Sequence, residues 1–217
     1  MTTIIFDLDG TLIHSTPDMT VAMNRMLAEE SAQPLDEATL QGFVGDGLFK
    51  LVERVIDHVG LDPARLDEIA PRVLAHYNAV NGQNTLLYPG VEGCLNTLAA
   101  KGDKLGICTN KPEAPARHVL GHFRMTGFFD AVVGGDTLTR RKPDPEPLLH
   151  TIALLGGYAD DTVYVGDSEV DEATAKNAGV PFALYTQGYR KKGATDFHAA
   201  LAFGDYGELT DWLIKRA

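Results

Sequence analysis

The sequence has few cysteines, no long hydrophobic run and fewer basic than acidic residues. Its two cysteines, Cys94 and Cys108, are too few for a disulfide framework, and both lie in apolar segments typical of buried, reduced thiols. No apolar run approaches the roughly 18 residues of a membrane span. The first residues lack the basic region of a signal peptide and instead read as a strand. We therefore expect a cytoplasmic protein that neither crosses nor binds a membrane.

The charge balance excludes another class of partner. The chain has 30 acidic and 19 basic residues, which gives a formal net charge of −11. General nucleic-acid binders and anionic-membrane binders need cationic surfaces that displace counterions, so we expect no nucleic-acid partner. A small anionic substrate remains compatible with this charge, because a local site can be positive on a negative protein.

The arrangement of apolar segments predicts an α/β fold with a doubly wound parallel sheet. Five short, continuous apolar runs alternate with amphipathic helical stretches, as in a parallel sheet buried on both faces. Ligands bind such sheets beyond the carboxyl ends of the strands, and here polar residues gather at those ends. The five runs are residues 4–6, 105–108, 131–133, 163–165 and 181–185.

One long segment lacks strands and predicts a helical insertion. Residues 14–82 carry apolar residues at helical spacing, in stretches around 19–27, 48–59 and 63–77. We expect this segment to form an α-helical cap, and residues 1–13 and 83–217 to form the catalytic core. The length of 217 residues fits one core with a sizeable insertion.

Asp7 and Asp9 form the most informative pair in the sequence, because they directly follow the first predicted strand. Two carboxylates at this spacing repel each other unless a cation lies between them. With a divalent metal, one can stay ionised as a nucleophile while the other carries a proton as a general acid and base. The alternative is an acidic turn, since the Asp9–Gly10 pair is common in turns.

Polar residues after the other strands make the acidic turn a poorer explanation. Thr109 and Asn110 can hold phosphate oxygens, and the Lys142 ammonium can neutralise a phosphoryl group together with the attacking carboxylate. Asp167 and Asp171 offer hard oxygen ligands suited to Mg²⁺. Each residue alone is weak evidence of a site, but their joint order at the ends of alternating strands is specific.

These motifs resemble the haloacid dehalogenase-like superfamily of phosphatases. The resemblance spans the chain in the order of that family and implies a doubly wound core with a helical cap inserted after the first motif. The motifs are Asp7-x-Asp9-Gly10-Thr11, Thr109, Lys142 and Gly166-Asp167-x-x-x-Asp171.

The resemblance also implies a catalytic role for each motif. Asp7 corresponds to the nucleophile that becomes an aspartyl-phosphate, and Asp9 to the residue that protonates the leaving group and then activates water. Thr109 and Lys142 correspond to the phosphoryl-binding residues.

A Mg²⁺ cofactor is implied in the same way. Its ligands would be Asp7, the backbone carbonyl of Asp9 and Asp167. Asp171 would be a fourth nearby carboxylate, whose direct ligation the sequence leaves open.

Within the superfamily, the sequence is most similar to the phosphoglycolate phosphatase subgroup, which implies 2-phosphoglycolate as the substrate. The similarity lies in residues 44–47, 88–91, 109–112 and 142–145, while His14 departs from the Asp found in many relatives. Other small metabolites, such as a sugar phosphate or pyrophosphate, stay open as substrates. So does a non-catalytic protein that binds a phosphorylated ligand.

Two cations of the predicted cap are candidates for binding a substrate carboxylate. Lys50 and Arg54 lie on a predicted helix, and a short anionic substrate needs a second cation beyond the phosphate site. The alternative is that both lie on a solvated helix face. The expected partner is a small phosphorylated metabolite, and the protein is expected to be a monomer or a homodimer.

Overall fold

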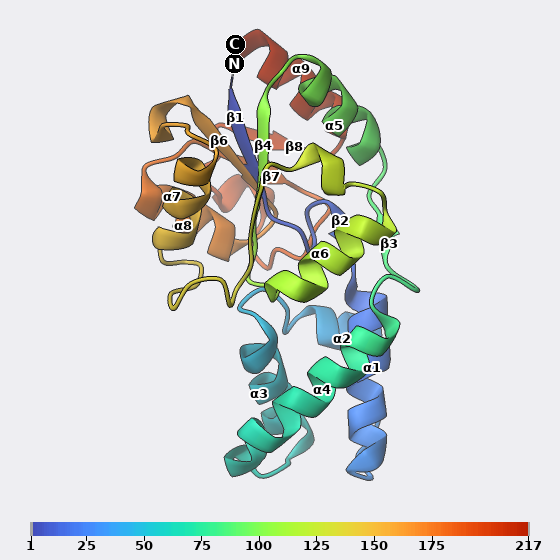
Figure 1. The fold of residues 1–217 in the computed structure, drawn as a ribbon. Helices are drawn as coiled ribbons and strands as arrows, with labels where there is room; N and C mark the ends of the chain where they lie inside the picture. The colour runs from blue at the N-terminus through green and yellow to red at the C-terminus, as the bar shows by residue number, and fades with distance from the viewer. Residues whose placement is uncertain (1, 217) are drawn as a thin grey trace.

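A computed structural model describes residues 2–216 and contains a six-stranded sheet flanked by helices (Figure 1). The strand order is β5-β4-β1-β6-β7-β8, and all neighbouring strands are parallel. The predicted doubly wound parallel fold is confirmed. The strands are β1 (Thr3–Phe6), β4 (Lys104–Cys108), β5 (Ala131–Val133), β6 (Thr162–Gly166), β7 (Phe182–Tyr185) and β8 (Leu201–Phe203).

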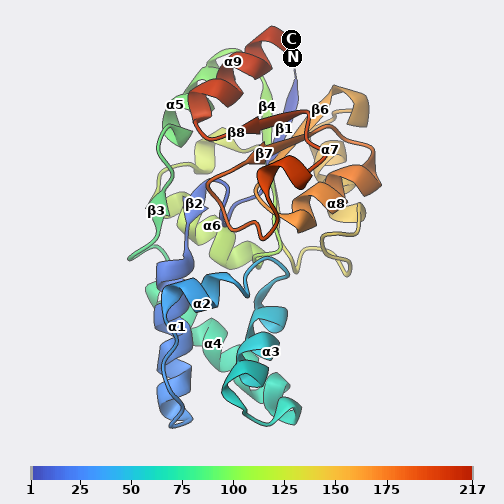
Figure 2. The ribbon, with the colours of Figure 1, turned by 180° about the vertical axis from the view of Figure 1, so that it is seen from behind.

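Helices cover both faces of this sheet, as Figures 1 and 2 show from opposite sides. Helices α5, α6 and α9 contribute to one apolar cluster against the sheet, and α7 and α8 contribute to the other. The chain winds from the central strand β1 to one edge and then returns to build the other edge. The helices are α5 (Val91–Ala100), α6 (Glu113–His122), α7 (Glu146–Leu154), α8 (Glu169–Ala178) and α9 (Tyr206–Arg216).

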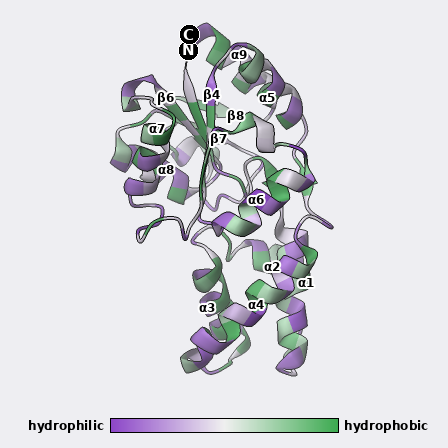
Figure 3. Cartoon of the chain, in the orientation of Figure 1, coloured by the Kyte–Doolittle hydropathy of each residue, from purple (hydrophilic) through white to green (hydrophobic). Residues whose placement is uncertain are grey.

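The strands are apolar on both faces because both faces are buried. In β1, Ile4 and Phe6 pack into one cluster while Ile5 packs into the other, and all three are fully buried. Such continuous apolar runs, coloured as hydrophobic in Figure 3, are what a parallel sheet between two helical layers requires. The sixth strand, β8, escaped the sequence analysis because it has only three residues and Ala202 is exposed.

Four helices form a separate unit below the sheet in Figure 1, here called the cap. Their inward side chains share one apolar cluster. Three of the helices were predicted, and the fourth, α2, has only five residues and gave no detectable periodicity. The cap helices are α1 (Thr16–Glu29), α2 (Glu37–Gln41), α3 (Leu48–Val59) and α4 (Leu66–Val80).

Helix α3 shows how the sequence specifies the cap. Leu51, Val52, Val55 and Ile56 recur at spacings of three and four residues and are all buried, so the helix turns one apolar face to its neighbours. Gly60 ends the helix in the left-handed conformation at φ 73°, where a side chain would be strained. None of the helices within residues 2–216 is long and apolar enough to span a membrane.

The two chain segments that join cap and core lie side by side. Before the cap, β2 (Ile13–His14) pairs antiparallel with β3 (Leu86–Leu87), which follows the cap. Deeper in the junction, Asp18 at the start of α1 is fully buried. Its carboxylate binds the returning segment over Gly82, Asn84 and Thr85, which together donate five hydrogen bonds of 2.6–3.1 Å.

These donors let Asp18 stay ionised in the interior. Burial alone would raise the pKa of its carboxyl, but the hydrogen bonds from Thr85 and Asn84 outweigh burial and lower it. Asp18 therefore holds the outgoing and returning segments together through one charged group.

We expect Asp18→Ala to lower the free energy of unfolding by about 2–4 kcal/mol, because buried donors would lose their acceptor. Chemical denaturation at neutral pH measures this change. Asp57→Ala, on the exposed face of α3, is the matched control and should change stability by less than about 0.5 kcal/mol. Equal stability of the two variants would contradict the importance of these hydrogen bonds.

Candidate active site

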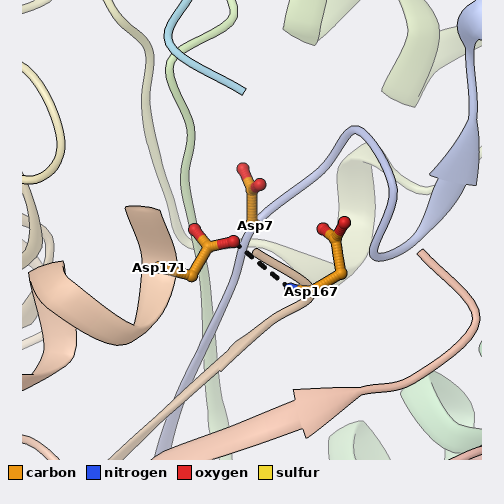
Figure 4. A group of neighbouring side chains, drawn as sticks. All are labelled: Asp7, Asp167 and Asp171. Atoms are coloured by element: carbon orange, nitrogen blue, oxygen red, sulfur yellow. Dashed lines mark hydrogen bonds between the residues drawn. The ribbon is translucent and has the colours of Figure 1, made fainter. Parts of the chain in front are cut away.

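The polar residues predicted from the strand ends converge at the carboxyl edge of the sheet. Asp7 follows β1, Thr109 follows β4, and Asp167 follows β6. Lys142 comes from the loop after β5 and reaches the same place, with its Nζ atom 2.9 Å from Oδ1 of Asp7. Figure 4 shows the side chains of Asp7, Asp167 and Asp171 gathered there.

Asp7 is buried with little hydrogen bonding to its carboxylate. Lys142 supplies a counter-charge to Oδ1, but it lies outside hydrogen-bonding geometry, and no described residue donates to this oxygen. Burial raises the pKa of Asp7 to about 6 despite the charge of Lys142. One carboxylate oxygen is thus left without a hydrogen-bond donor beside a positive charge.

Asp167 lies on the other side of the site and is fixed by two donors. Its oxygens accept hydrogen bonds of 2.7 Å from Oγ1 of Thr11 and 2.6 Å from the backbone N–H of Tyr189. Burial, together with the charges of Asp171 and Asp7, nevertheless raises the pKa of Asp167 well above its usual range. The carboxylates therefore repel one another in the absence of further positive charge.

This charge excess makes the site suitable for a divalent cation. Oxygen atoms of Asp7, Asp167 and Asp171 lie within 4.8 Å of one another, and all three residues are buried. Hard carboxylate oxygens are the ligands that Mg²⁺ prefers, and the raised pKa values of Asp7 and Asp167 show that Lys142 does not balance the charges of the three carboxylates. The residues present therefore fit a Mg²⁺ ion.

Asp171 differs from the other two because donors already surround both of its oxygens. Oδ1 accepts from Nζ of Lys142 at 2.6 Å and from the Tyr164 hydroxyl at 2.9 Å. Oδ2 accepts from Oγ of Ser168 at 2.6 Å and from the N–H groups of Ser168 and Asp167. Direct ligation of a metal by Asp171 stays a prediction, and this saturated arrangement does not favour it.

The Asp171 contacts have a clear local origin. Ser168 and Asp171 form a capping box at the start of α8, in which each side chain binds the other's backbone N–H. The charge and hydrogen bond of Lys142 oppose the effect of burial and hold the pKa of Asp171 below its usual range. The start of α8 therefore presents an ionised carboxylate that orients Lys142.

Asp9 lies at the boundary between core and cap, two residues beyond Asp7. Its Oδ1 accepts hydrogen bonds of 2.6 Å from Oγ of Ser15 and 2.8 Å from Nζ of Lys111, whose distance to Oδ2 is 3.1 Å. Lys111 in turn donates to the Tyr77 hydroxyl of α4 at 2.5 Å. Core and cap thus meet where the Asp9 carboxylate, the Lys111 ammonium and the Tyr77 hydroxyl are hydrogen-bonded in series.

Sequence reasoning missed Lys111 and Tyr77. Tyr77 enters only as the end of a predicted helix, and Lys111 only as part of residues 109–112, which resemble the subgroup, so neither was given a role in the site. A signal did exist, because Lys111 directly follows Thr109 and Asn110 at the functional end of β4. Its burial depends on the cap residues that cover it, and these are distant in sequence.

Thr109 and Asn110 link the strand ends to neighbouring loops. Asn110 exchanges two hydrogen bonds of 3.1 Å with the backbone of Lys142, and its Nδ2 also donates to the carbonyl of Gly45 at 3.2 Å. The hydroxyl of Thr109 accepts from the N–H of Lys111. Both residues lie beside Asp7 and Asp9 at the carboxyl edge of the sheet, as their position after a strand predicts.

Lys50 and Arg54 are not among the residues that line the cavity next to Asp7 and Asp9. Arg54 donates to Asp46 at 2.5 Å and to the carbonyl of Phe43 at 2.7 Å, so its guanidinium is bound within the cap. Lys50 is half exposed and pairs with Glu53. In this arrangement, binding of a substrate carboxylate by either residue stays a prediction without a supporting contact.

A cavity of about 70 Å³ lies between the cap and the carboxyl edge of the sheet. Apolar side chains of the cap form one wall, and polar groups of the core form the other. The core side includes Asp7, Asp9, Thr109, Asn110 and Lys111.

Comparisons with known proteins agree with this geometry. Residues 4–185 match a family model described as haloacid dehalogenase-like hydrolase. The chain is 44% identical over 212 residues to a protein of Cereibacter sphaeroides named phosphoglycolate phosphatase, covering 97% of this chain and 96% of that protein. It is 45% identical to a protein of the same name from Rhodospirillum rubrum, covering 97% and 90% of the two chains.

A solved structure shares the whole architecture. The crystal structure of a predicted phosphoglycolate phosphatase from Haemophilus somnus superposes with a TM-score of 0.92 at 27% sequence identity. The match covers 98% of this chain and 97% of that one, so it includes both the sheet and the cap.

We expect Mg²⁺ to stabilise the protein by about 2.7 kcal/mol at a hundred times its dissociation constant, as mass action requires. The effect should be smaller at pH 5 than at pH 7, because protons compete for Asp7, whose pKa without metal is about 6. Thermal denaturation with and without Mg²⁺ measures both effects. Asp167→Asn should abolish most of the shift and Asp57→Asn should not; an undiminished shift in Asp167→Asn would place the ion elsewhere.

Proposed function

The chain belongs to the haloacid dehalogenase-like hydrolase family and is a phosphatase, and we propose that it converts 2-phosphoglycolate to glycolate and phosphate. The reaction would proceed through an aspartyl-phosphate on Asp7 and depend on Mg²⁺. The following steps assign the chemistry to residues of this chain.

The observation that carries the mechanism is the environment of Asp7. Its Oδ1 is buried, lies beside the Lys142 ammonium and accepts no hydrogen bond from the described residues. Among the described residues, the Lys142 ammonium is the one cation paired with this oxygen, so Oδ1 of Asp7 keeps a lone pair available for attack on phosphorus, unlike the oxygens of Asp171. Asp9, two residues further on, is more exposed and lies toward the cap, where the leaving group would be placed.

In the first half-reaction, an oxygen of Asp7 attacks phosphorus and the bond from phosphorus to the leaving oxygen breaks. Asp9 gives its proton to that oxygen, so glycolate leaves as the alcohol and the phosphoryl group stays on Asp7. Ser15 and Lys111 hold the Asp9 carboxylate in place for this transfer.

In the second half-reaction, Asp9 takes a proton from a water molecule whose oxygen attacks the phosphorus. The bond between phosphorus and Asp7 then breaks, which releases phosphate and restores the Asp7 carboxylate. Asp9 regains the proton that it gave away in the first half-reaction, so the cycle closes.

Phosphoryl oxygens would be bound by the groups at the neighbouring strand ends. Lys142 supplies positive charge and Thr109 a hydroxyl. The two amide N–H groups of Asn110 bind the carbonyls of Gly45 and Lys142, so Asn110 would hold the backbone of Lys142 beside the phosphoryl group. Asp171 acts on the reaction through Lys142, because its 2.6 Å contact fixes the position of the ammonium. It is therefore a positioning residue.

Mg²⁺ would be held by Asp7, Asp167 and the backbone carbonyl of Asp9, and would supply positive charge to the phosphoryl oxygens. The cap, for which we propose residues 14–82, would exclude bulk water and contact the leaving group. The cavity between cap and core, which Asp7 and Asp9 line together, is where the leaving group would lie.

Asp7→Asn should reduce turnover at least about 10³-fold, because the amide is a poor nucleophile. The variant should still fold, since the amide replaces a carboxylate of nearly the same shape whose Oδ1 accepts no hydrogen bond. Phosphate release under saturating substrate measures turnover, and circular dichroism checks the fold. Near wild-type hydrolysis by a folded Asp7→Asn protein would exclude the nucleophile assignment.

Asp9→Asn should slow both half-reactions by about 10²–10⁴-fold, as expected for loss of a general acid and base. Rapid mixing followed by acid quenching would show slower formation and slower decay of the acyl-phosphate. Asp57→Asn serves as the control on the cap surface. Slowing of only one half-reaction would restrict Asp9 to that half.

The substrate is tested by a panel of phosphorylated metabolites compared by kcat/KM. We expect 2-phosphoglycolate to exceed a hexose phosphate and pyrophosphate at least about tenfold, because one added or missing group in a small cavity changes binding by that order. A tenfold preference for either competitor would contradict the substrate assignment and leave the phosphatase assignment intact.

A further inference from the structure

We propose that Lys111, held by Tyr77 of the cap, binds an anionic group on the leaving-group side of the substrate and so selects phosphomonoesters of short hydroxy acids. This inference rests on the proposed function for the position of the leaving group. It replaces Lys50 and Arg54, the cations expected from the sequence, with a residue that lines the cavity.

The charge distribution of the cavity points to Lys111. Of the described residues that line it, Lys111 alone carries a positive charge, and its side chain is only 2% exposed. Cap residues such as Met19, Leu48 and Leu51 make the facing wall apolar. Asp7 and Asp9 also line the cavity and Asp9 pairs with Lys111, so Lys111 is the one charged group among the described lining residues that can attract an anion, and its burial strengthens that attraction.

The position of Lys111 matches the leaving group. Its Nζ atom lies 2.8 Å from Oδ1 of Asp9. In the proposed reaction, Asp9 is the residue that gives its proton to the leaving alcohol oxygen. A carboxylate one carbon beyond that alcohol oxygen therefore comes within reach of Nζ. The three N–H groups of the ammonium donate to the two oxygens of Asp9, at 2.8 and 3.1 Å, and to the Tyr77 hydroxyl. A substrate carboxylate would replace the longer of the two bonds to Asp9, which leaves Asp9 and Tyr77 each with one bond to Lys111.

Tyr77 fixes this ammonium from the cap side. Its hydroxyl accepts from Lys111 at 2.5 Å, and the Lys111 ammonium lies 4.6 Å from the centre of the ring. The same hydroxyl donates to Asn81 at 2.9 Å, and Asn81 donates to the carbonyl of Pro115 in the core. Tyr77 is thus held on both sides of the junction, and it keeps Lys111 at the cavity wall.

The test compares two non-hydrolysable ligands by isothermal titration calorimetry on the Mg²⁺-loaded protein. 3-Phosphonopropionate replaces the ester oxygen of 2-phosphoglycolate by a methylene group and keeps the carboxylate, whereas propylphosphonate lacks it. We expect the wild type to bind 3-phosphonopropionate about 10- to 100-fold more tightly, as for a charge-assisted contact in a buried site. In Lys111→Gln the ratio of the two dissociation constants should fall to near one.

Three further variants separate specificity from structure. Lys111→Arg keeps the charge and should restore part of the preference, and Tyr77→Phe should give an intermediate ratio because it loosens the ammonium. Lys215→Gln removes one exposed lysine charge from the last turn of α9 and should keep the wild-type ratio. Denaturation curves confirm that each variant is folded.

Two results would overturn the proposal. One is a wild type that binds both phosphonates equally, and the other is a folded Lys111→Gln protein that weakens both to the same extent, which would confine Lys111 to holding Asp9. Failure of the proposed function looks different. In that case the wild type would not hydrolyse 2-phosphoglycolate, yet its preference for 3-phosphonopropionate would still depend on Lys111.

Discussion

Repulsion among buried carboxylates is the constraint on which the whole site depends. Parallel strands bring Asp7, Asp167 and Asp171 to one edge of the sheet, where burial disfavours their ionisation. Lys142 balances part of this charge and, with Tyr164, binds one oxygen of Asp171, while the start of α8 binds the other. The negative charge that remains is concentrated on Asp7 and Asp167, which is why the site suits a divalent cation.

The same principle of charge balance organises the boundary with the cap. Asp9 has its own buried lysine, Lys111, and that lysine is held by a tyrosine from the cap. Asp7 and Asp9 thus each have a separate ammonium, one from the loop after β5 and one from the end of β4. The core supplies the charges on both sides, whereas the cap supplies the apolar wall and the group that orients Lys111.

The sequence predicted the core of this arrangement well and its cap side poorly, for a physical reason. Asp7, Thr109 and Asp167 directly follow buried strands, so the geometry of a parallel sheet brings them together whatever the loops do. Lys111 and Tyr77 meet through contacts between cap and core, which no local pattern records. Lys50 and Arg54 were predicted from their charge and their place on a cap helix, and in the structure they pair with Glu53 and Asp46, while their binding of a substrate stays a prediction. Short elements such as α2 and β8 carry too few residues for a periodic signal.

The burial of Asp18 between the outgoing and returning segments has a mechanical consequence. Two linkers without a contact between them would let the cap shift and rotate relative to the core, because each linker could change its conformation independently. Here one carboxylate ties both linkers at a single point, and the β2–β3 pair continues the tie toward the core. The junction therefore restrains the cap at one point, so any rotation of the cap about that point would change the separation of Tyr77 and Lys111.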